Sequence, residues 1–252
     1  MRLYLGSVAW EHEKEGFAQS MRLLVRELDK RGIGFEEGFG VGDALVSRSR
    51  SMVASAFLRS DCDVLLTIDT DIWFRAEDAI ALAEKAVAYD IIAGLYMTRN
   101  LRTQPALMLP NKPVVMAPDS EPVEAQFVST GFMAVHRSVF EKLSETLPLC
   151  HVNWEDKGLD TSFWPFYMPY VIPWEGDGHM YLSEDWAFCQ RAKDLGFKTW
   201  LDPSIRLGHS GQVMFTLEDL LRLPKPGPVP LVLERSADGG LETHVLERSK
   251  PK

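Results

Sequence analysis

The sequence predicts an α/β fold in which a mostly parallel sheet is flanked by helices. Short apolar runs alternate with segments of helical periodicity along the amino-terminal half, which is the pattern of a doubly wound sheet. The run at 64–68 is almost entirely aliphatic, as expected of a strand buried on both faces. It leads directly into Asp69 and Asp71, at the end of the strand where open α/β sheets bind their ligands.

Strands and helices are expected in turn along the amino-terminal half. The first helix has apolar residues at helical spacing, Lys30 and Arg31 in its last turn, and Gly32 as its stop. Asp43 is the predicted N-cap of the second helix. The expected strands are 2–9, 34–39, 64–68 and 90–95, and the expected helices are 16–31, 43–58 and 77–88.

The carboxyl-terminal half is expected to be less regular. Prolines in 105–128 predict edge strands and loops. The aromatic-rich segment 153–181 is interpreted as a long irregular loop, a type that is usually functional or mobile. The other expected elements are strands at 130–135, 198–201 and 205–207 and helices at 138–146 and 183–195.

The last segment of the chain is expected to be a linker followed by a hairpin. The Lys-Pro-Gly-Pro sequence at 225–228 is typical of a linker. Two β-like runs, 229–233 and 242–246, flank an Asp-Gly-Gly sequence at 238–240, which predicts a tight turn between them.

The composition excludes several classes of protein. With 252 residues, of which 46% are hydrophobic, the chain can form one large α/β domain with a sizeable core. A net charge of −9 argues against broad binding of nucleic acid or anionic membranes. Three cysteines without C-x-x-C spacing predict free thiols in a reducing compartment. Because we find neither a signal peptide nor a membrane-spanning run, we expect a soluble, cytoplasmic protein.

The most informative motif is the pair of acids Asp69 and Asp71. Side chains two residues apart in a strand point the same way, so both carboxylates can reach one cation or one ligand. Two such charges about 4 Å apart repel by about 4 kcal/mol at an effective dielectric of roughly 20. A divalent cation removes that cost, so the pair indicates an oxygen-rich Mg²⁺ or Mn²⁺ site. The alternative is a solvated strand end that caps a helix.

Two further motifs carry candidate functional residues. Glu184 and Asp185 begin a predicted helix, where acids are also favoured simply as caps and dipole partners. His209 lies between Gly208 and the Ser210-Gly211 pair. Glycines let a backbone approach a ligand closely, although a lone histidine is more often an ordinary hydrogen-bonded residue.

Several short segments occur along the chain in an order that resembles a known family. They are Ser47-Arg48-Ser49-Arg50, Leu66-Thr67-Ile68-Asp69-Thr70-Asp71, Ala93-Gly94-Leu95-Tyr96, Thr130-Gly131-Phe132-Met133, Ser183-Glu184-Asp185, Gly196-Phe197-Lys198 and Gly208-His209-Ser210-Gly211. Together they resemble the GT-A glycosyltransferases, nucleotide-sugar-dependent enzymes, and their inverting, family-2-like members in particular. The resemblance implies a GT-A-like, Rossmann-type sandwich. Its catalytic domain would span 1–223, divided into a nucleotide-sugar-binding half (1–100) and an acceptor-binding half (101–223), with a linker and hairpin at 224–252.

The resemblance also implies a role for each acid and for the histidine. Asp71 would ligate Mn²⁺ or Mg²⁺ beside the diphosphate, and Asp69 would face the donor ribose or the same ion. His209 would add a metal ligand or a phosphate contact. Asp185 would be the base that removes the proton of the acceptor hydroxyl, while Glu184 orients the acceptor.

The rest of the donor site follows from the same resemblance. The first strand would end beside the base, one of two arginines on a helix would meet the diphosphate, and a glycine would let the backbone approach the donor. Arg99 lies either near the donor sugar or at the flank of a loop. The residues expected to bind the donor are Val8, Ala9, Trp10, Arg48, Arg50, Asp69, Thr70, Asp71 and Gly131.

The predicted function is a metal-dependent glycosyltransferase that moves a hexose from a UDP- or GDP-sugar to a hydroxyl of a carbohydrate or other acceptor, with inversion. One alternative is a sugar-phosphate nucleotidyltransferase, but such enzymes usually carry a glycine-rich loop after the first strand, and residues 7–12 do not provide it. The other alternative is a non-catalytic carbohydrate- or nucleotide-binding module. The sugar, the base, the acceptor, inversion versus retention, any homo-oligomer and the role of the C-terminal tail stay open.

Overall fold

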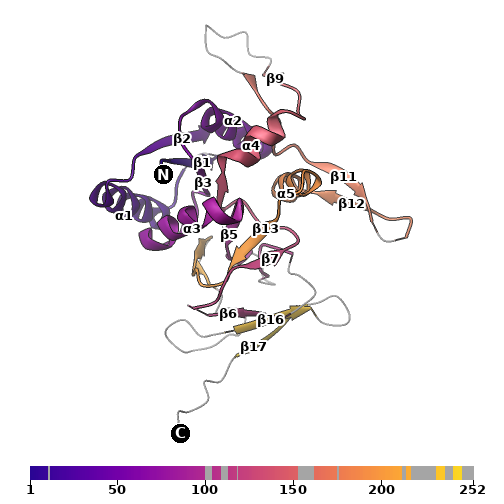
Figure 1. Cartoon of the computed structure of the whole chain (residues 1–252). Helices are drawn as coiled ribbons and strands as arrows, with labels where there is room; N and C mark the ends of the chain where they lie inside the picture. The colour runs from indigo at the N-terminus through magenta and orange to yellow at the C-terminus, as the bar shows by residue number, and fades with distance from the viewer. Residues whose placement is uncertain are drawn as a thin grey trace.

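The computed structural model is built around one central sheet (Figure 1). It describes residues 1–252 except 11, 100–103, 109–112, 118, 153–161, 175, 212–213, 217–230, 236–240 and 246–252. The strands of the sheet are β1 (Leu3–Ala9), β2 (Phe35–Val41), β3 (Val64–Ile68), β5 (Ile91–Gly94), β7 (Val123–Ala125), β8 (Phe132–His136) and β13 (Thr199–Asp202). Their order is β2-β1-β3-β8-β5-β13-β7, and only β7 and β8 oppose the direction of the others. The predicted mostly parallel α/β sheet is therefore confirmed.

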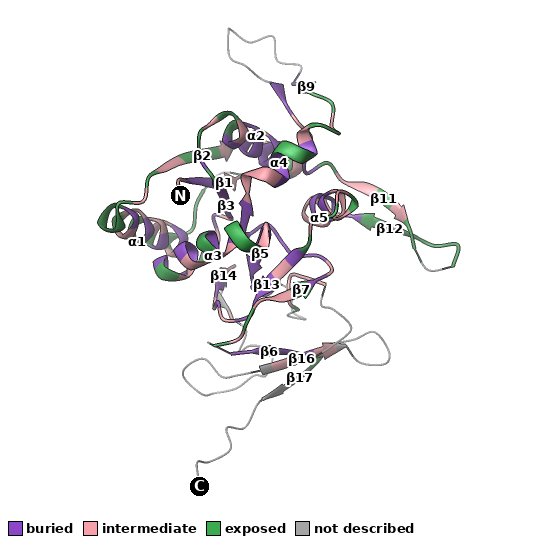
Figure 2. Cartoon of the chain, viewed as in Figure 1, coloured by how far each residue is buried: buried purple, intermediate pink, exposed green. Residues whose placement is uncertain are grey.

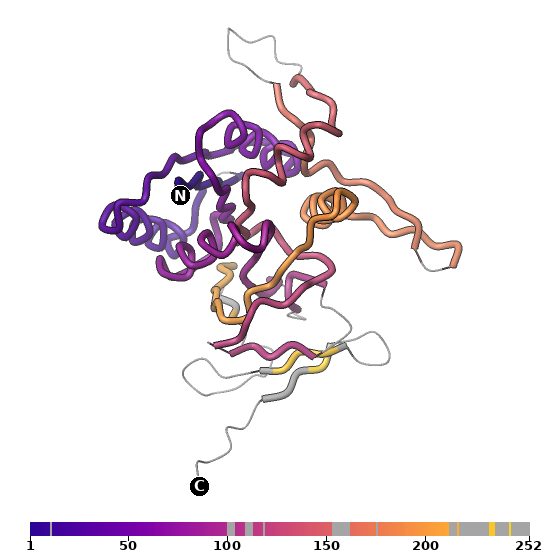
Figure 3. Tube along the Cα trace, in the orientation of Figure 1, coloured from indigo at the N-terminus to yellow at the C-terminus, as the bar shows by residue number. Residues whose placement is uncertain are grey.

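Segments that are far apart in the sequence lie side by side in this sheet. Strand β8 is inserted between β3 and β5, and β13 adds to the far side of β5. In the trace of Figure 3, the orange segment that follows α5 (Glu184–Asp194) accordingly runs back toward the magenta centre of the molecule. Both of the halves expected from the sequence, 1–100 and 101–223, thus contribute strands to one sheet. The expected division between donor and acceptor halves stays a prediction.

Helices cover both faces of the sheet. They are α1 (Glu15–Arg31), α2 (Val46–Arg59), α3 (Ala76–Tyr89), α4 (Arg137–Ser144) and α5 (Glu184–Asp194). Helices α1 and α3 pack on one face with strand residues such as Leu5 and Leu66, and α2, α4 and α5 pack on the other with Tyr4 and Leu65. This sorting follows from the alternation of side chains along a strand.

Strand β3 lies in the middle of this core. Every residue of β3 is buried, and Figure 2 shows the buried residues of the sheet between the two helical layers. Burying an aliphatic side chain of this size contributes roughly 1.5–3 kcal/mol. The carboxyl end of β3, which Asp69 directly follows, is therefore anchored in the buried core.

Shorter strands form small sheets around the central one. The hairpin of β11 (Tyr170–Pro173) and β12 (His179–Leu182) extends away from the body of the molecule (Figure 1). The other short strands are β4 (Ile72–Trp73) and β15 (Met214–Phe215) on either side of β14 (Gly208–Ser210), β6 (Val114–Met116) with β16 (Leu231–Arg235) and β17 (Leu241–Val245), and β9 (Cys150–His151) with β10 (Ser162–Phe163).

Three expectations about elements were wrong. The N-cap of α2 is Leu45, not Asp43, because the Asp43 carboxylate instead accepts a hydrogen bond from the Leu45 amide and binds Arg48. Residues 205–207 are not a strand; the strand there is β14, which pairs with β4 outside the central sheet. The segment 153–181 is not one loop, since its described part contains β10, β11 and the start of β12.

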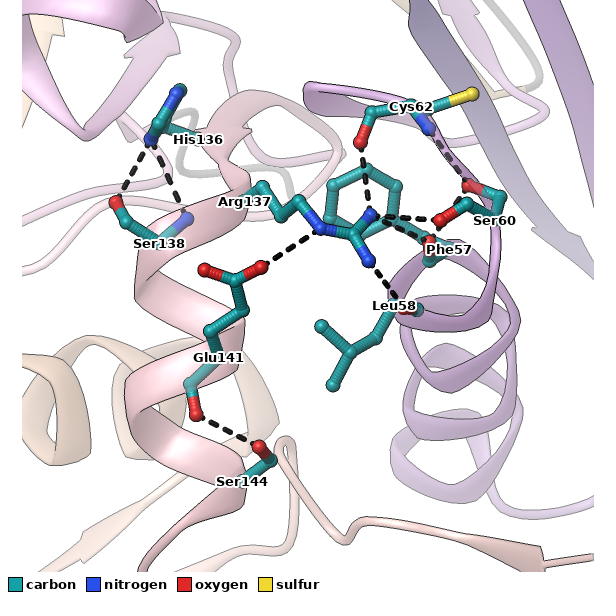
Figure 4. Close-up of polar contacts among 9 residues, drawn as sticks. All are labelled: Phe57, Leu58, Ser60, Cys62, His136, Arg137, Ser138, Glu141 and Ser144. Atoms are coloured by element: carbon teal, nitrogen blue, oxygen red, sulfur yellow. Dashed lines mark hydrogen bonds and ion pairs between the residues drawn. The ribbon is translucent and has the colours of Figure 1, made fainter.

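Arg137 ties the end of α2 to the start of α4 (Figure 4). Its guanidinium donates to the carbonyl oxygens of Leu58, Ser60 and Cys62 at 2.6, 3.0 and 3.0 Å, and its Nε donates to Glu141 at 2.9 Å. The last carbonyls of a helix lack partners within the helix, so a cation there satisfies them. Helix α2, which carries Arg48 and Arg50, is thus fixed at its carboxyl end.

Other expectations concern the termini, the cysteines and membranes. The hairpin expected at 229–233 and 242–246 is confirmed as β16 and β17, and the expected linker at 225–228 lies outside the described residues.

All three cysteines are free thiols, as expected. Among the helices that the structure describes, none has both the length and the apolar character needed to cross a membrane. The cytoplasmic location stays a prediction.

Candidate functional site

The candidate site lies where β1 and β3 end, at the carboxyl edge of the sheet. Asp69 directly follows β3, and its amide donates to the Gly131 carbonyl at 2.9 Å. Thr70 donates through Oγ1 to the Val8 carbonyl at 3.3 Å and accepts from the Lys14 amide at 2.8 Å. These bonds join the acidic motif to the end of β1 and to the start of α1.

Asp69 is bound by Arg50, which points inward from α2. Two guanidinium nitrogens of Arg50 lie 2.8 and 3.0 Å from the two carboxylate oxygens of Asp69, and Nε lies 3.8 Å from Oε1 of Glu184. The Arg50 side chain is only 8% exposed. Burial would lower the pKa of Arg50, but the Asp69 carboxylate outweighs it and raises this pKa. Arg50 is therefore a fixed internal counter-charge that links β3, α2 and α5.

Asp71 faces His209. The pairing of β4 with β14 brings His209 to the same edge of the central sheet as Asp71. His209 is opposite Ile72 in this pairing, and the Ser210 amide donates to the Asp71 carbonyl at 2.7 Å. Nε2 of His209 lies 3.4 Å from Oδ1 of Asp71, and that buried oxygen has no hydrogen-bond partner in the described part of the protein.

The other ring nitrogen of His209 defines its tautomer. Nδ1 lies 2.6 Å from the carbonyl oxygen of Met97, which can only accept, so Nδ1 carries a proton. In a neutral imidazole Nε2 is then an acceptor, and it faces Oδ1 of Asp71, another acceptor. The two atoms need a cation between them, or a second proton on the ring.

Arg99 holds the other oxygen of Asp71. Its Nη1 lies 2.9 Å from Oδ2 of Asp71 and 3.4 Å from the Ser210 carbonyl, and its side chain is 45% exposed. Burial would raise the pKa of Asp71, but His209 and Arg99 outweigh it and hold the pKa below its usual value. Asp71 therefore stays ionised at neutral pH, as a metal ligand must.

The residues present fit a divalent cation at Asp71 and His209. A carboxylate oxygen and an imidazole nitrogen suit Mn²⁺, and the partnerless Oδ1 is the atom that the ion would satisfy. Asp69, the third predicted ligand, instead has both oxygens on Arg50. Among the described residues, the only place where the ligand atoms of three His, Cys, Asp or Glu side chains come close together is at Glu36, Asp61 and Cys62, outside this site.

Glu184 and Asp185 open α5 on the other side of Arg50. Burial and the neighbouring Asp185 raise the pKa of Glu184, while Arg50 opposes them. Oδ1 of Asp185 accepts from the Ser183 hydroxyl and, at 2.8 Å, from the Trp186 amide. One Asp185 oxygen is thus held in place by the start of the helix, which orients the other.

A cavity of about 350 Å³ lies between the end of β1 and the start of α2. The end of β1 forms one wall and the start of α2 the other, and Trp10 at its mouth is 60% exposed. Arg48 is bound to Asp43 in the cavity wall by two hydrogen bonds of 2.7 Å, whereas Arg50 turns to Asp69. The lining residues are Val8, Ala9, Trp10, Asp43, Ala44, Val46 and Ser49.

Tyr96 is a site residue that the sequence reasoning missed. Its hydroxyl accepts a hydrogen bond from the Gly131 amide at 3.2 Å, and its ring packs edge-on against His209 at 5.1 Å. A Cβ on Gly131 would lie 2.4 Å from that hydroxyl. The close approach of Tyr96 is therefore sufficient to explain why residue 131 is a glycine, without a contact to the donor. No periodic signal marked Tyr96, because its partners come from distant segments.

Comparison with known proteins finds similarity to solved structures only. No protein-family model matches the chain, and no curated protein matches it. A mutant Drosophila β1,4-galactosyltransferase 7 in complex with manganese, UDP-Gal and xylobiose is 15% identical over 80% of this chain and 65% of that one, with a TM-score of 0.41. GalNAc-T7 with UDP, GalNAc and Mn²⁺ is 11% identical over 87% and 47% of the two chains, with a TM-score of 0.47. S. aureus TarS is 10% identical over 80% of this chain and 35% of that one, with a TM-score of 0.42.

These similar structures are glycosyltransferases, the class that the sequence resembles. The chain spans from 35% to 65% of their lengths. Because the identities are 15% or lower and the TM-scores lie below 0.5, we infer function from the geometry of the site.

Proposed function

We propose that the chain is a metal-dependent glycosyltransferase that uses a UDP- or GDP-sugar and transfers its sugar to a hydroxyl group. The observation that carries this proposal is the contact of Asp71 with His209: Nε2 of His209 lies 3.4 Å from the buried Oδ1 of Asp71, which has no hydrogen-bond partner in the described residues. A divalent cation, Mn²⁺ or Mg²⁺, between them would take both atoms as ligands. A metal held this way offsets the charge of a departing nucleoside diphosphate.

The cavity at the end of β1 supports a nucleotide donor. Its volume of about 350 Å³ lies within the range of small-molecule sites, which begins at roughly 300 Å³. The hydrogen bond from Thr70 to Val8 connects its wall to the acidic motif. A nucleoside in the cavity would place its diphosphate toward Asp71, with Trp10 free to cover the base.

The acidic start of α5 supports the transfer step. Asp185, with one oxygen fixed by Ser183 and Trp186, would accept the proton of the acceptor hydroxyl. The hydroxyl oxygen then bonds to the anomeric carbon as the bond from that carbon to the diphosphate oxygen breaks, which inverts the centre. Glu184, which lies beside Arg50 at the start of the same helix, would orient the acceptor.

The test is release of nucleoside diphosphate from a panel of UDP- and GDP-hexoses with simple sugar acceptors and Mn²⁺. We expect release that is lost in EDTA and in Asp185→Asn. Asp194→Asn is the matched control, because Asp194 lies on the same helix and is exposed. Failure of every donor would contradict the proposal. Pyrophosphate release from a nucleoside triphosphate and a sugar phosphate would favour the nucleotidyltransferase instead.

A further inference from the structure

Arg50 and Arg99 bind the two aspartates of the acidic motif, Asp69 and Asp71, in different ways. Arg50 is buried and contacts both oxygens of Asp69. Arg99 is 45% exposed and contacts a single oxygen of Asp71, at 2.9 Å. An exposed guanidinium on a flexible side chain can leave a carboxylate with little loss of stability, whereas a buried one cannot.

The backbone next to Arg99 is anchored, while its side chain is 45% exposed and is held only by Asp71 and the Ser210 carbonyl among the contacts of the described residues. The Thr98 amide donates to the Gln104 carbonyl at 2.7 Å, and the Gln104 amide donates to the Thr98 hydroxyl at 3.1 Å. Met97, two residues before Arg99, holds Nδ1 of His209. Arg99 therefore starts from a fixed point next to both proposed metal ligands.

Charge balance shows when Arg99 is needed at Asp71. Without a cation, the single charge of Arg99 neutralises Asp71. With a divalent cation on Asp71, the ion and Arg99 together leave two positive charges in excess. The diphosphate link of a nucleotide sugar carries two negative charges, so it restores neutrality if both the ion and Arg99 contact it.

We propose that Arg99 is an exchangeable counter-ion, which pairs with Asp71 before the metal binds, yields Asp71 to the metal, and then binds the diphosphate of the donor. This inference rests on the proposed function. Its consequence is a pair of opposite effects: Arg99 weakens binding of metal alone and strengthens binding of the nucleoside diphosphate to the metal-loaded protein.

The test measures Mn²⁺ alone, and then UDP and GDP at saturating Mn²⁺, by calorimetry on the full chain and its Arg99→Gln variant. Arg31→Gln is the matched control: Arg31 is 38% exposed and lies 2.8 Å from Glu27 on α1, so the same charge and a similar ion pair are removed elsewhere. Circular dichroism and melting temperature check that each variant is folded.

We expect Arg99→Gln to bind Mn²⁺ more tightly than Arg31→Gln, by up to about fivefold, the upper range for an exposed ion pair. We expect its affinity for the preferred diphosphate to fall by about tenfold or more, as on loss of a charge-assisted hydrogen bond. If Arg99→Gln binds Mn²⁺ no more tightly than Arg31→Gln, while the control still binds the diphosphate, the proposed role of Arg99 is overturned and the proposed function is not. Absence of Mn²⁺-dependent diphosphate binding in the unmodified protein overturns the proposed function as well.

Discussion

Asp69 and Asp71 are neighbours in one motif, yet their surroundings differ. Oδ1 of each carboxylate is buried without a hydrogen bond, but Oδ1 of Asp69 lies 2.8 Å from a nitrogen of the buried Arg50, whereas Oδ1 of Asp71 lies 3.4 Å from His209. The second oxygen of Asp69 also binds Arg50, and that of Asp71 pairs with the exposed Arg99. The comparison teaches that the motif combines two tasks. Asp69 holds β3, α2 and α5 together, and Asp71 remains available to a ligand.

Removal of Arg50 should have the largest effect. Arg50→Met leaves the carboxylates of Asp69 and Glu184 close together without their shared cation. Loss of one partner of a buried ion pair costs about 3–5 kcal/mol. Urea unfolding should show this loss, and Arg99→Met should lose no more than about 1 kcal/mol, as expected of an exposed pair. Equal losses in the two variants would end the distinction between a structural and an available acid.

Gly131→Ala should cause an intermediate loss of stability. It tests whether Gly131 is needed because of its contact with Tyr96. The added Cβ would lie 2.4 Å from the Tyr96 hydroxyl, so Tyr96 must shift against His209. Overpacking of this kind costs roughly 1–3 kcal/mol. Tyr96→Phe removes the oxygen, so the double variant should lose less than the sum of the single losses. Strict additivity in thermal unfolding would exclude this contact as the reason for the glycine.

The smallest effect is a contrast in pH dependence. The pKa of Glu184 is raised in the folded protein, mainly by burial, so its stabilising contribution is present at low pH and is lost as pH rises through that pKa. The pKa of Asp71 is lowered by His209 and Arg99 against the effect of burial, so its contribution is present above the unfolded pKa and is lost as pH falls.

The neutral amides Glu184→Gln and Asp71→Asn should therefore shift stability with pH in opposite directions. Relative to the unmodified protein, Glu184→Gln should become more stable as pH rises above about 4.5, the ordinary pKa of a glutamate, because an amide imitates the protonated acid. Asp71→Asn should become relatively less stable as pH rises through the acid range up to about 3.8, the ordinary pKa of an aspartate, because the folded protein favours the ionised carboxylate. Melting temperatures along a pH series measure both slopes, and slopes of one sign would show that the two acids share one environment.

Much of the fold could be predicted because it follows from local periodicity. The buried run of β3, the apolar stripe of α1 and its stop at Gly32 need no information from distant residues. The errors fall where tertiary contacts decide. Asp43 has the chemistry of a cap but binds Arg48, and the strand near His209 begins only where it can pair with β4.

The candidate site was predicted in its residue types and less well in its pairings. The chain brings Asp71 and His209 together through a two-strand contact, which the order of motifs anticipated. The roles of Arg50 and Arg99 could not be separated from sequence, because both are arginines near acids. Their difference is one of burial and of the number of contacts, which only the folded chain defines.

The most direct test is a crystal structure with Mn²⁺ and UDP or GDP, in which anomalous scattering locates the metal. The account predicts an anomalous peak that is coordinated by Oδ1 of Asp71 and Nε2 of His209 and touches the diphosphate, while Asp69 remains on Arg50. A nucleotide bound in the cavity without a metal peak at Asp71, or a peak ligated by Asp69 with Arg50 displaced, would contradict it.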